Sequence, residues 1–378
     1  MIYEPLRSTQ FVVRELLLKV DKQNVSLVIG IPKENQKVEK RLAITPETAT
    51  LLVESGYQVV IESDAGLAIN YSDRYYADSG AHIAQSKAEV FQADIILKIS
   101  PPTYEEVSMM KPRSSVFSFL QLHLISSETL DLMAEKRINA LAYELINDDN
   151  QISPFVTAIS EIEGAYSISV ASELLSSAHG GKGILLGGVP GISPTEVVII
   201  GAGVAGAVAA RAALALGAAV KIFDNDINKL RKIQHELGRM VFTSTLQPNV
   251  LRNVFRSADV AIGAMQYVNK THLYRISTDL IREMKKGALV IDLRISHGGC
   301  FETTMEACLP DHPQVFERFG ILHFCELMTE SGGVGRLARF DRGFASGFYM
   351  FSGKMVNSYV ANHFNWPVND IGLFLPGL

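Results

Sequence analysis

The chain has few cysteines and no cluster of metal-binding side chains. Its 378 residues include three cysteines, Cys300, Cys308 and Cys325, with no Cys-x-x-Cys pair among them. A small, odd number in a chain this long predicts free thiols in a reducing compartment, because a disulfide framework needs paired cysteines. No grouping of His and Cys has the spacing of zinc ligands, so we expect no metal site.

The sequence also lacks basic clusters and long uninterrupted apolar runs. Lys and Arg number 35 against 40 Asp and Glu, and no stretch has the clustered positive charge that nucleic acid requires. Charged residues interrupt positions 1–21, which predicts a short amphipathic helix at 10–20 and no signal peptide. The Ala- and Gly-rich stretch 203–223 contains Arg211 and Lys221, as expected of a buried helix and strand. We therefore expect a cytoplasmic protein that binds neither nucleic acid nor membrane.

What is present is an alternation of apolar strands and helices in two parts of the chain. A single hydrophobic core rarely serves 378 residues, so two domains are expected. The pattern predicts an α/β fold of two Rossmann-like, doubly wound parallel-sheet domains with a cleft between them. The first domain would comprise 1–150 plus 327–378, since domain termini often lie close together, and the second 151–326. Strands are expected at 26–31, 57–62, 95–99, 116–124, 139–143, 196–200, 219–223, 260–263, 288–293 and 320–325, with a bridging helix at 159–177.

A glycine-rich loop follows the first strand of the second domain. The motif GAGVAG at 201–206 lies between an apolar strand and a helix of small residues. Gly201 permits the tight turn, Gly203 lets a pyrophosphate approach the backbone, and Gly206 lets the helix pack closely on the strand. The free N–H groups at the helix start, from Val204 and Ala205 onward, would bind the pyrophosphate. This strand–loop–helix setting is typical of a dinucleotide site.

An acidic residue ends the next strand and bears on the choice of cofactor. Asp224 lies 23 residues after Gly201, where a carboxylate accepts hydrogen bonds from the adenosine ribose and repels a 2′-phosphate. Asn225 and Asp226 offer no cation for that phosphate. We therefore predict NAD as the cofactor. The alternative is that Asp224 only caps the following helix.

Several motifs together resemble one family. The chain is similar to the alanine dehydrogenase and nicotinamide-nucleotide transhydrogenase N-terminal superfamily, with alanine dehydrogenase the nearer branch. The resemblance covers roughly residues 27–325 and is dense across them. The matching segments are GIPKE at 30–34, KRLAITP at 40–46, AGL at 65–67, ADIILK at 93–98, SEI at 160–162 with Gly164, GKGILLGGVPG at 181–191, GAGVAG at 201–206 and GGCFE at 298–302.

The resemblance implies an activity and roles for individual residues. Family members oxidatively deaminate L-alanine to pyruvate and ammonia with NAD, and they assemble as dimers or hexamers. Arg41 matches the arginine that binds the substrate carboxylate, and Ser160 falls in the cofactor region. Lys98 is a second candidate for the carboxylate, because it ends a predicted strand. The alternatives are a surface arginine at position 41 and a structural ion pair at Lys98, since the family's substrate lysine falls on Ser100.

The catalytic positions of the family are substituted here. Its histidine falls on Gln121, whose amide exchanges no proton at physiological pH. If 116–124 is a strand, Gln121 and His123 share one face, so that His123 either reaches the site or is a partly buried structural histidine. The family's aspartate falls on Ser296, with His297 beside it, while Asp292 would support a loop. Losing a general acid or base typically slows a reaction about 10²- to 10⁴-fold.

Three functions remain open on the sequence. The first is an alanine dehydrogenase-like oxidoreductase with a rearranged site, acting on a small carboxylate or amino-acid substrate and forming a homo-oligomer. The second is an NAD(H)-binding homologue without catalysis, as a sensor or pseudoenzyme. The third is a transhydrogenase-like NAD(H) domain, which needs no acid or base but needs a partner chain. Gln121 and Ser296 argue against the first function, whereas Arg41 and Lys98 argue for a carboxylate ligand.

Overall fold

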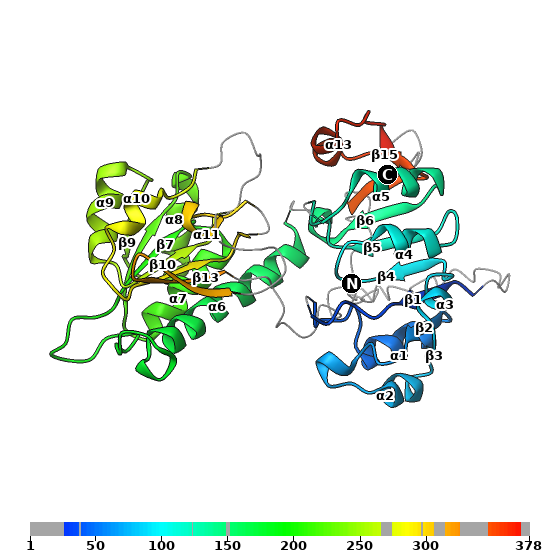
Figure 1. The fold of residues 1–378 in the computed structure, drawn as a ribbon, viewed down its shortest axis with the longest axis horizontal. Coiled ribbons are helices and arrows are strands. Elements are labelled where there is room, and N and C mark those ends of the chain that lie inside the picture. The colour runs from blue at the N-terminus through cyan, green and yellow to red at the C-terminus, as the bar shows by residue number, and fades with distance from the viewer. Residues whose placement is uncertain are drawn as a thin grey trace, which may run out of the picture.

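The chain forms two α/β units connected by one long helix. The computed structural model describes residues 26–37, 39–122, 124–148, 152–265, 274–295, 298–305, 314–325 and 347–371. Helix α6 (Pro154–Leu175) runs from one unit to the other (Figure 1). Among these residues no helix combines the length and apolarity needed to span a bilayer. The amphipathic helix predicted at 10–20 lies outside the described residues.

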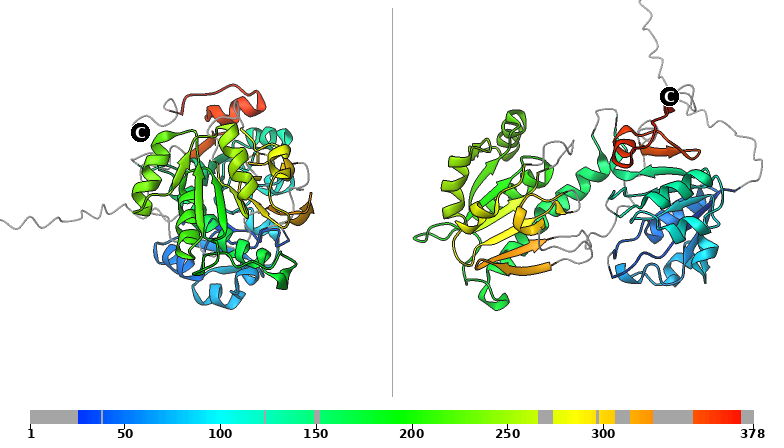
Figure 2. Two further views of the ribbon diagram at one scale, coloured as in Figure 1. Left: turned by 90° about the vertical axis from the view of Figure 1, so that its left-hand side faces the viewer. Right: turned by 45° about the horizontal axis from the view of Figure 1, so that its top comes forward.

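The first unit is an eight-stranded sheet in the order β15-β14-β6-β5-β4-β1-β2-β3. Strands β1 to β6 are parallel, while β14 pairs antiparallel with β6 and β15 with β14. The late strands therefore join the first sheet, where Figure 2 shows the red segment beside the green and cyan strands. The strands are β1 (Val28–Ile31), β2 (Gln58–Glu62), β3 (His82–Ala84), β4 (Ile95–Leu97), β5 (Ser115–Ser118), β6 (Asn139–Ala142), β14 (Phe348–Phe351) and β15 (Lys354–Met355).

Local sequence signals account for the helices of this unit. Helix α1 begins after Thr45 with Pro46 at its first position, where the missing N–H is harmless. In α4, Thr103 and Glu106 form a capping box, each side chain bonding the other's backbone N–H. The helices are α1 (Pro46–Glu54), α2 (Asp73–Asp78), α3 (Lys87–Val90), α4 (Tyr104–Met109), α5 (Ser127–Glu135) and α13 (Ser358–Phe364).

The second unit is a seven-stranded sheet in the order β12-β13-β11-β10-β7-β8-β9. It is parallel except for β12 at its edge. Its central strands are apolar and buried, as expected when helices cover both faces. The elements are β7 (Glu196–Ile200), α7 (Val204–Ala215), β8 (Ala219–Phe223), α8 (Ile227–Leu237), β9 (Phe242–Ser244), α9 (Pro248–Ser257), β10 (Val260–Gly263), α10 (Thr278–Arg282), β11 (Leu289–Asp292), α11 (Glu302–Met305), β12 (Gln314–Arg318) and β13 (Ile321–Cys325).

Both sheets reverse their strand order beside their first strand. In the first sheet β1 lies between β2 and β4, and in the second β7 lies between β8 and β10. Open α/β sheets bind ligands at such a switch point, beyond the carboxyl ends of the strands. The predicted α/β class is confirmed, with the correction that both sheets are mixed, because antiparallel strands are added at their edges.

Two local predictions are wrong. The strand predicted at 116–124 ends at Ser118, so Gln121 is not on a strand and the shared-face argument for Gln121 and His123 fails. The chain turns because the N–H of Leu120 bonds the Glu144 carboxylate at 2.6 Å instead of continuing the sheet. Cys300 is a free, buried thiol, but Cys325 is disulfide-bonded, so the prediction of free thiols throughout fails at Cys325.

Candidate functional site

The glycine loop has the backbone geometry that its motif predicts. Gly201 has φ +115°, and a Cβ there would lie 2.6 Å from the backbone of Ala264. A Cβ at Gly206 would lie 2.0 Å from the Gly201 carbonyl oxygen, so helix α7 could not pack this close to the loop. At Gly203, by contrast, no atom of the described residues lies within 4 Å of the Cβ position. The loop is thus closed on the protein side and open where a pyrophosphate would approach.

Asp224 lies directly beside this loop. Its carboxylate accepts hydrogen bonds from the backbone N–H of Ala202 at 2.8 Å and of Asp226 at 2.8 Å. The cap of α8 is Asp226, whose side chain accepts from Asn228, so the alternative that Asp224 caps this helix is wrong. Asn225 accepts from the N–H of Leu246 at 3.2 Å. The acidic side chain is therefore fixed at the end of β8, next to the open side of the loop.

Helix α6 brings Ser160 to the end of the second sheet. Gly164 allows this, because a Cβ there would lie 2.3 Å from the Ala205 carbonyl oxygen of α7. One turn earlier along α6, the buried Ser160 hydroxyl accepts a hydrogen bond from Nη2 of Arg294 at 3.2 Å. The close crossing of α6 and α7 therefore places Ser160 near the start of α7.

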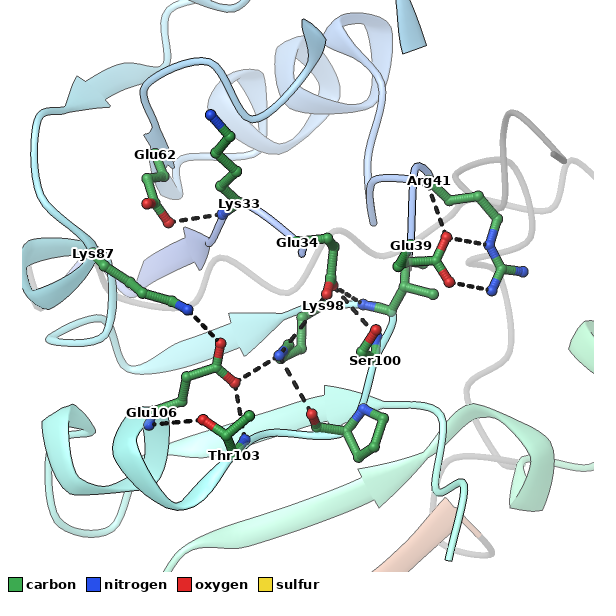
Figure 3. Close-up of polar contacts among 12 residues, drawn as sticks. Lys33, Glu34, Glu39, Arg41, Glu62, Lys87, Lys98, Ser100, Thr103 and Glu106 are labelled. Carbon is green, nitrogen blue, oxygen red and sulfur yellow. Dashed lines mark hydrogen bonds and ion pairs between the residues drawn. The ribbon is translucent and has the colours of Figure 1, made fainter. Parts of the chain in front are cut away.

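Arg41 is buried, which rules out the alternative of a surface arginine. It is 4% exposed, and its Nε and Nη2 donate to the two carboxylate oxygens of Glu39 at 2.8 and 2.6 Å (Figure 3). Its guanidinium carbon lies 5.8 Å from the centre of the Phe119 ring. Within the described part of the chain, Nη1 is buried and has no hydrogen-bond partner. Glu39 thus holds the guanidinium rigidly and leaves the N–H groups of Nη1 for a ligand.

Lys98 lies in a buried network of ion pairs. Its Nζ is 2.7 Å from Oε2 of Glu106, 3.4 Å from the Pro101 carbonyl oxygen and 3.9 Å from Oε2 of Glu34 (Figure 3). Burial alone would raise the pKa of Glu106, but Lys98 and Lys87 hold it below its ordinary value. These contacts are the ones expected if Lys98 forms a structural ion pair, which is the alternative to its binding the substrate carboxylate.

Glu34 connects this network to the loop that follows β4. Its Oε1 accepts the backbone N–H of Ile99 at 2.5 Å and of Ser100 at 3.4 Å (Figure 3). Burial raises the pKa of Glu34. Glu34, the last residue of the GIPKE segment, therefore fixes the backbone at Ser100, three residues after the end of β4.

Gln121 lies in a tight turn beyond β5. Its φ is +34°, and its carbonyl oxygen accepts from the N–H of Leu124 at 2.8 Å. Behind the turn is Glu144, a carboxylate missed by the sequence analysis, whose pKa burial raises to about 7. The sequence could have indicated Glu144 by its position directly after the predicted strand 139–143. This strand ends at the same edge of the sheet as the strand before Gln121. His123 lies outside the described residues.

At the end of β11, Asp292 organises the loop that carries the remaining candidates. Its carboxylate accepts the N–H groups of Arg294 at 3.0 Å and Cys300 at 2.9 Å, and the Thr304 hydroxyl at 2.6 Å. The prediction that Asp292 supports a loop is confirmed. Ser296, at the position of the family's catalytic aspartate, and His297 beside it are candidate catalytic residues, and both lie outside the described residues.

Arg294 and Glu163 are site residues that the sequence analysis missed. They form a buried ion pair, with Nη2 of Arg294 3.2 Å from Oε2 of Glu163. Burial raises the pKa of Glu163, whereas Arg294 and Arg41 act to lower it. Charges of both units therefore act on one carboxylate of the connecting helix. The available signal was a charged residue directly after the predicted strand 288–293.

The described residues offer no candidate metal centre. In the ranges that the structure covers, no group of three His, Cys, Asp or Glu side chains could hold a metal ion. The polar groups described above include guanidinium, ammonium, carboxylate, hydroxyl and backbone N–H groups. These suit an anionic dinucleotide and a small charged ligand.

Comparison with known proteins identifies two matching family models. The model described as alanine dehydrogenase/PNT, N-terminal domain, matches residues 30–163, and that of the C-terminal domain matches 167–331. The chain is 35% identical to an alanine dehydrogenase of Staphylococcus saprophyticus over 79% of this chain and 80% of that one. It is 31% identical to an alanine dehydrogenase of Mycolicibacterium smegmatis over 92% of this chain and 100% of that one.

Solved structures show the same arrangement. An L-alanine dehydrogenase superposes with a TM-score of 0.76 at 27% identity, covering 90% of this chain and 99% of that one. A transhydrogenase from Sinorhizobium meliloti shares the fold, with a TM-score of 0.68 at 21% identity, covering 88% of this chain and 99% of that one.

Proposed function

The chain belongs to the alanine dehydrogenase/PNT family, and from this premise we propose that it is an NAD-dependent oxidoreductase that deaminates L-alanine to pyruvate and ammonia. The observation that carries the proposal is Arg41, a buried guanidinium held by Glu39 with Nη1 unpartnered among the described residues. A buried donor without a partner is costly, so a ligand is expected to supply the acceptor. A carboxylate is the natural acceptor for a guanidinium.

NAD is the cofactor that the second unit fits. Gly201, Gly203 and Gly206 form the loop for the pyrophosphate, and the N–H groups of Val204 and Ala205 belong to the free first turn of α7. Asp224 would accept the adenosine ribose hydroxyls, with Asn225 holding the neighbouring loop. When bound, NAD takes up two electrons and the α-hydrogen of the substrate.

In the proposed reaction the protein binds and orients the amino acid. Arg41 holds the substrate carboxylate, and Gln121 would orient the substrate by hydrogen bonds from its turn. Lys98 would contribute its positive charge to the electrostatic potential at the substrate site. It also belongs to the ion-pair network that fixes the backbone at Ser100. His123, Ser296 and His297 remain proposed proton-handling or water-binding residues. Ser160 would lie between the cofactor and Arg294.

The division into domains and the assembly are also proposals. We propose a substrate domain of residues 1–150 with 327–378 and a cofactor domain of 151–326, supported by the two separate sheets and by the pairing of β14 with β6. A homo-oligomer, either dimer or hexamer, is proposed from the family alone. Size-exclusion chromatography with light scattering would measure it.

The first test is turnover and its dependence on Arg41. Purified protein given NAD and L-alanine should form NADH, and pyruvate, ammonium and NADH should react in reverse. Arg41→Lys keeps a positive charge beside Glu39 but loses the paired N–H groups, so kcat/KM for L-alanine should fall about 10- to 100-fold. The control is Arg74→Lys, because Arg74 is exposed on α2.

Absence of turnover would separate cofactor binding from catalysis. If NADH binds but neither direction turns over, the alanine dehydrogenase proposal fails. The second function is then left, an NAD(H)-binding homologue without catalysis, which the missing proton-exchanging group at Gln121 favours.

A further inference from the structure

Three buried charged side chains act on one another near α6, which connects the two units. Arg41 comes from the first unit, Glu163 from α6, and Arg294 from the loop after β11. They are 4%, 5% and 6% exposed, respectively. Arg294 pairs with Glu163 at 3.2 Å, and the charge of Arg41 also acts on Glu163. The cluster thus joins the proposed carboxylate arginine to the ligand edge of the cofactor sheet.

Each of these side chains carries a buried atom that makes no hydrogen bond. Among the residues that the structure describes, these atoms are Nη1 of Arg41, Nε of Arg294 and Oε2 of Glu163. Oε2 is in the ion pair with Arg294 but accepts no hydrogen bond from it. Leaving such groups unsatisfied is unfavourable, by more for charged groups than for neutral ones. One guanidinium nitrogen from each arginine and one carboxylate oxygen are the complement of a carboxylate and an ammonium group on one small molecule.

Lys98, the second candidate for the substrate carboxylate, is already engaged. Nζ of Lys98 contacts Glu106, Pro101 and Glu34. Ser100, two residues later, has no positive charge. Arg294 can supply a second cation for the substrate from another element, because it is buried, charged and in contact with Ser160.

Resting on the proposed function, we propose that Arg294 and Glu163 complete the amino-acid site: Arg294 binds the substrate carboxylate together with Arg41, and Glu163 receives a proton from the substrate ammonium. Glu163 is then the catalytic base that Gln121 cannot be. The second carboxylate-binding group lies on the cofactor unit, so the substrate bridges both units.

The proton step balances as follows. One N–H bond of the ammonium breaks and an O–H bond forms at Oε2 of Glu163, which leaves a neutral amine. The amine lone pair forms the C=N bond as the α-hydrogen leaves with its two electrons to NAD. The substrate would lose two electrons, which bound NAD would accept.

The two residues can be separated by using a ligand that lacks the nitrogen. Pyruvate binding to the NADH-loaded protein, followed by NADH fluorescence, requires the carboxylate partners only. Arg294→Lys keeps a charge beside Glu163 but loses Nε, so the Kd for pyruvate should rise about tenfold or more. Glu163→Gln should bind pyruvate as tightly as the parent protein or more tightly.

Turnover should show the reverse pattern. Glu163→Gln should lower kcat for L-alanine about 10²- to 10⁴-fold and abolish the rise of kcat with pH that accompanies deprotonation of Glu163. The matched control is Glu173→Gln, an exposed carboxylate further along α6. Its kcat, pH profile and Kd for pyruvate should be those of the parent protein.

Equal weakening of pyruvate binding and of alanine turnover in Glu163→Gln would overturn the proposal, because it would make Glu163 a structural partner of Arg294. An unchanged pH profile would overturn it as well. Should Glu163→Gln fail to fold, Glu163→Asp keeps the charge but withdraws the carboxylate, and unchanged kcat in that variant would also refute the proposal. Absence of turnover in the parent protein would instead refute the proposed function.

Discussion

At the scale of single residues, burial decides what each charged group can do. Glu144 has one oxygen bonded to the N–H of Leu120, and its other oxygen is buried without a hydrogen-bond partner in the described part of the chain. Burial raises its pKa to about 7. The carboxyl group behind the Gln121 turn therefore changes its charge near neutral pH, whereas a surface glutamate would be ionised throughout.

This shift predicts how stability depends on pH. Between the ordinary glutamate pKa and about 7, the unfolded chain has lost the proton of Glu144 while the folded protein keeps it. The free energy of unfolding therefore falls as pH rises through this window, by up to about 3 kcal/mol. Glu144→Gln should remove this fall. The free energy of unfolding of the variant, compared with that of the parent protein, should therefore be more favourable at pH 8 than at pH 5.

Urea denaturation followed by tryptophan fluorescence would measure the effect, since the single tryptophan, Trp366, packs on the core of the first unit. The control is Glu135→Gln, at an exposed position on α5. If the two variants have the same pH dependence, the Glu144 carboxyl group is not the cause.

At the scale of elements, the crossing of α6 and α7 sets the position of the cofactor helix. A Cβ at Gly164 would lie 2.3 Å from the Ala205 carbonyl oxygen and 3.0 Å from the Val208 Cβ. Alanine normally stabilises a helix interior by about 1 kcal/mol over glycine. At Gly164 the contact reverses that sign, because the two helices would have to separate.

Gly164→Ala should therefore lower the free energy of unfolding by about 1 to 3 kcal/mol and weaken NADH binding about tenfold. Fluorescence titration with NADH and thermal denaturation would check both effects. Ala165→Gly, at the exposed next position, should be destabilising through helix propensity alone and leave the Kd for NADH unchanged. Normal NADH affinity in Gly164→Ala would show that the crossing does not position the cofactor helix.

At the scale of the whole molecule, the late strands β14 and β15 belong to the sheet of the first unit. Met350 on β14 is fully buried in the core that also contains Leu130 and Ala140. A buried methionine replaced by alanine leaves a cavity and costs about 2 to 5 kcal/mol. Met350→Ala should lower the stability reported by Trp366 by that amount.

The Kd of Met350→Ala for NADH should stay that of the parent protein, because the glycine loop lies on the other sheet. Bound NADH should meanwhile protect the second unit by mass action. Weakened NADH binding in this variant would mean that the two units do not unfold as separate bodies.

The sequence by itself determined the elements whose signals are local. The strands at 196–200, 219–223 and 260–263 have the predicted bounds, since each is an apolar run between turn residues. The glycine loop and Asp224 were predictable for the same reason, because the dinucleotide motif is continuous and each of its residues has one backbone role. The resemblance of its motif to the family identified Arg41 as the candidate for the substrate carboxylate. Only the structure shows that Arg41 is buried.

Only the tertiary structure decided which distant side chains meet. Ser160 and Arg294 are 134 positions apart, yet they form a hydrogen bond because α6 crosses the end of β11. Lys98 became an ion-pair partner because Glu34 and Glu106 approach it from other elements, and Gln121 left the sheet because Glu144 bonds the backbone beside it. Local patterns specify secondary structure, whereas these contacts depend on how elements pack, and burial then sets the charge and the free hydrogen-bonding atoms of each group.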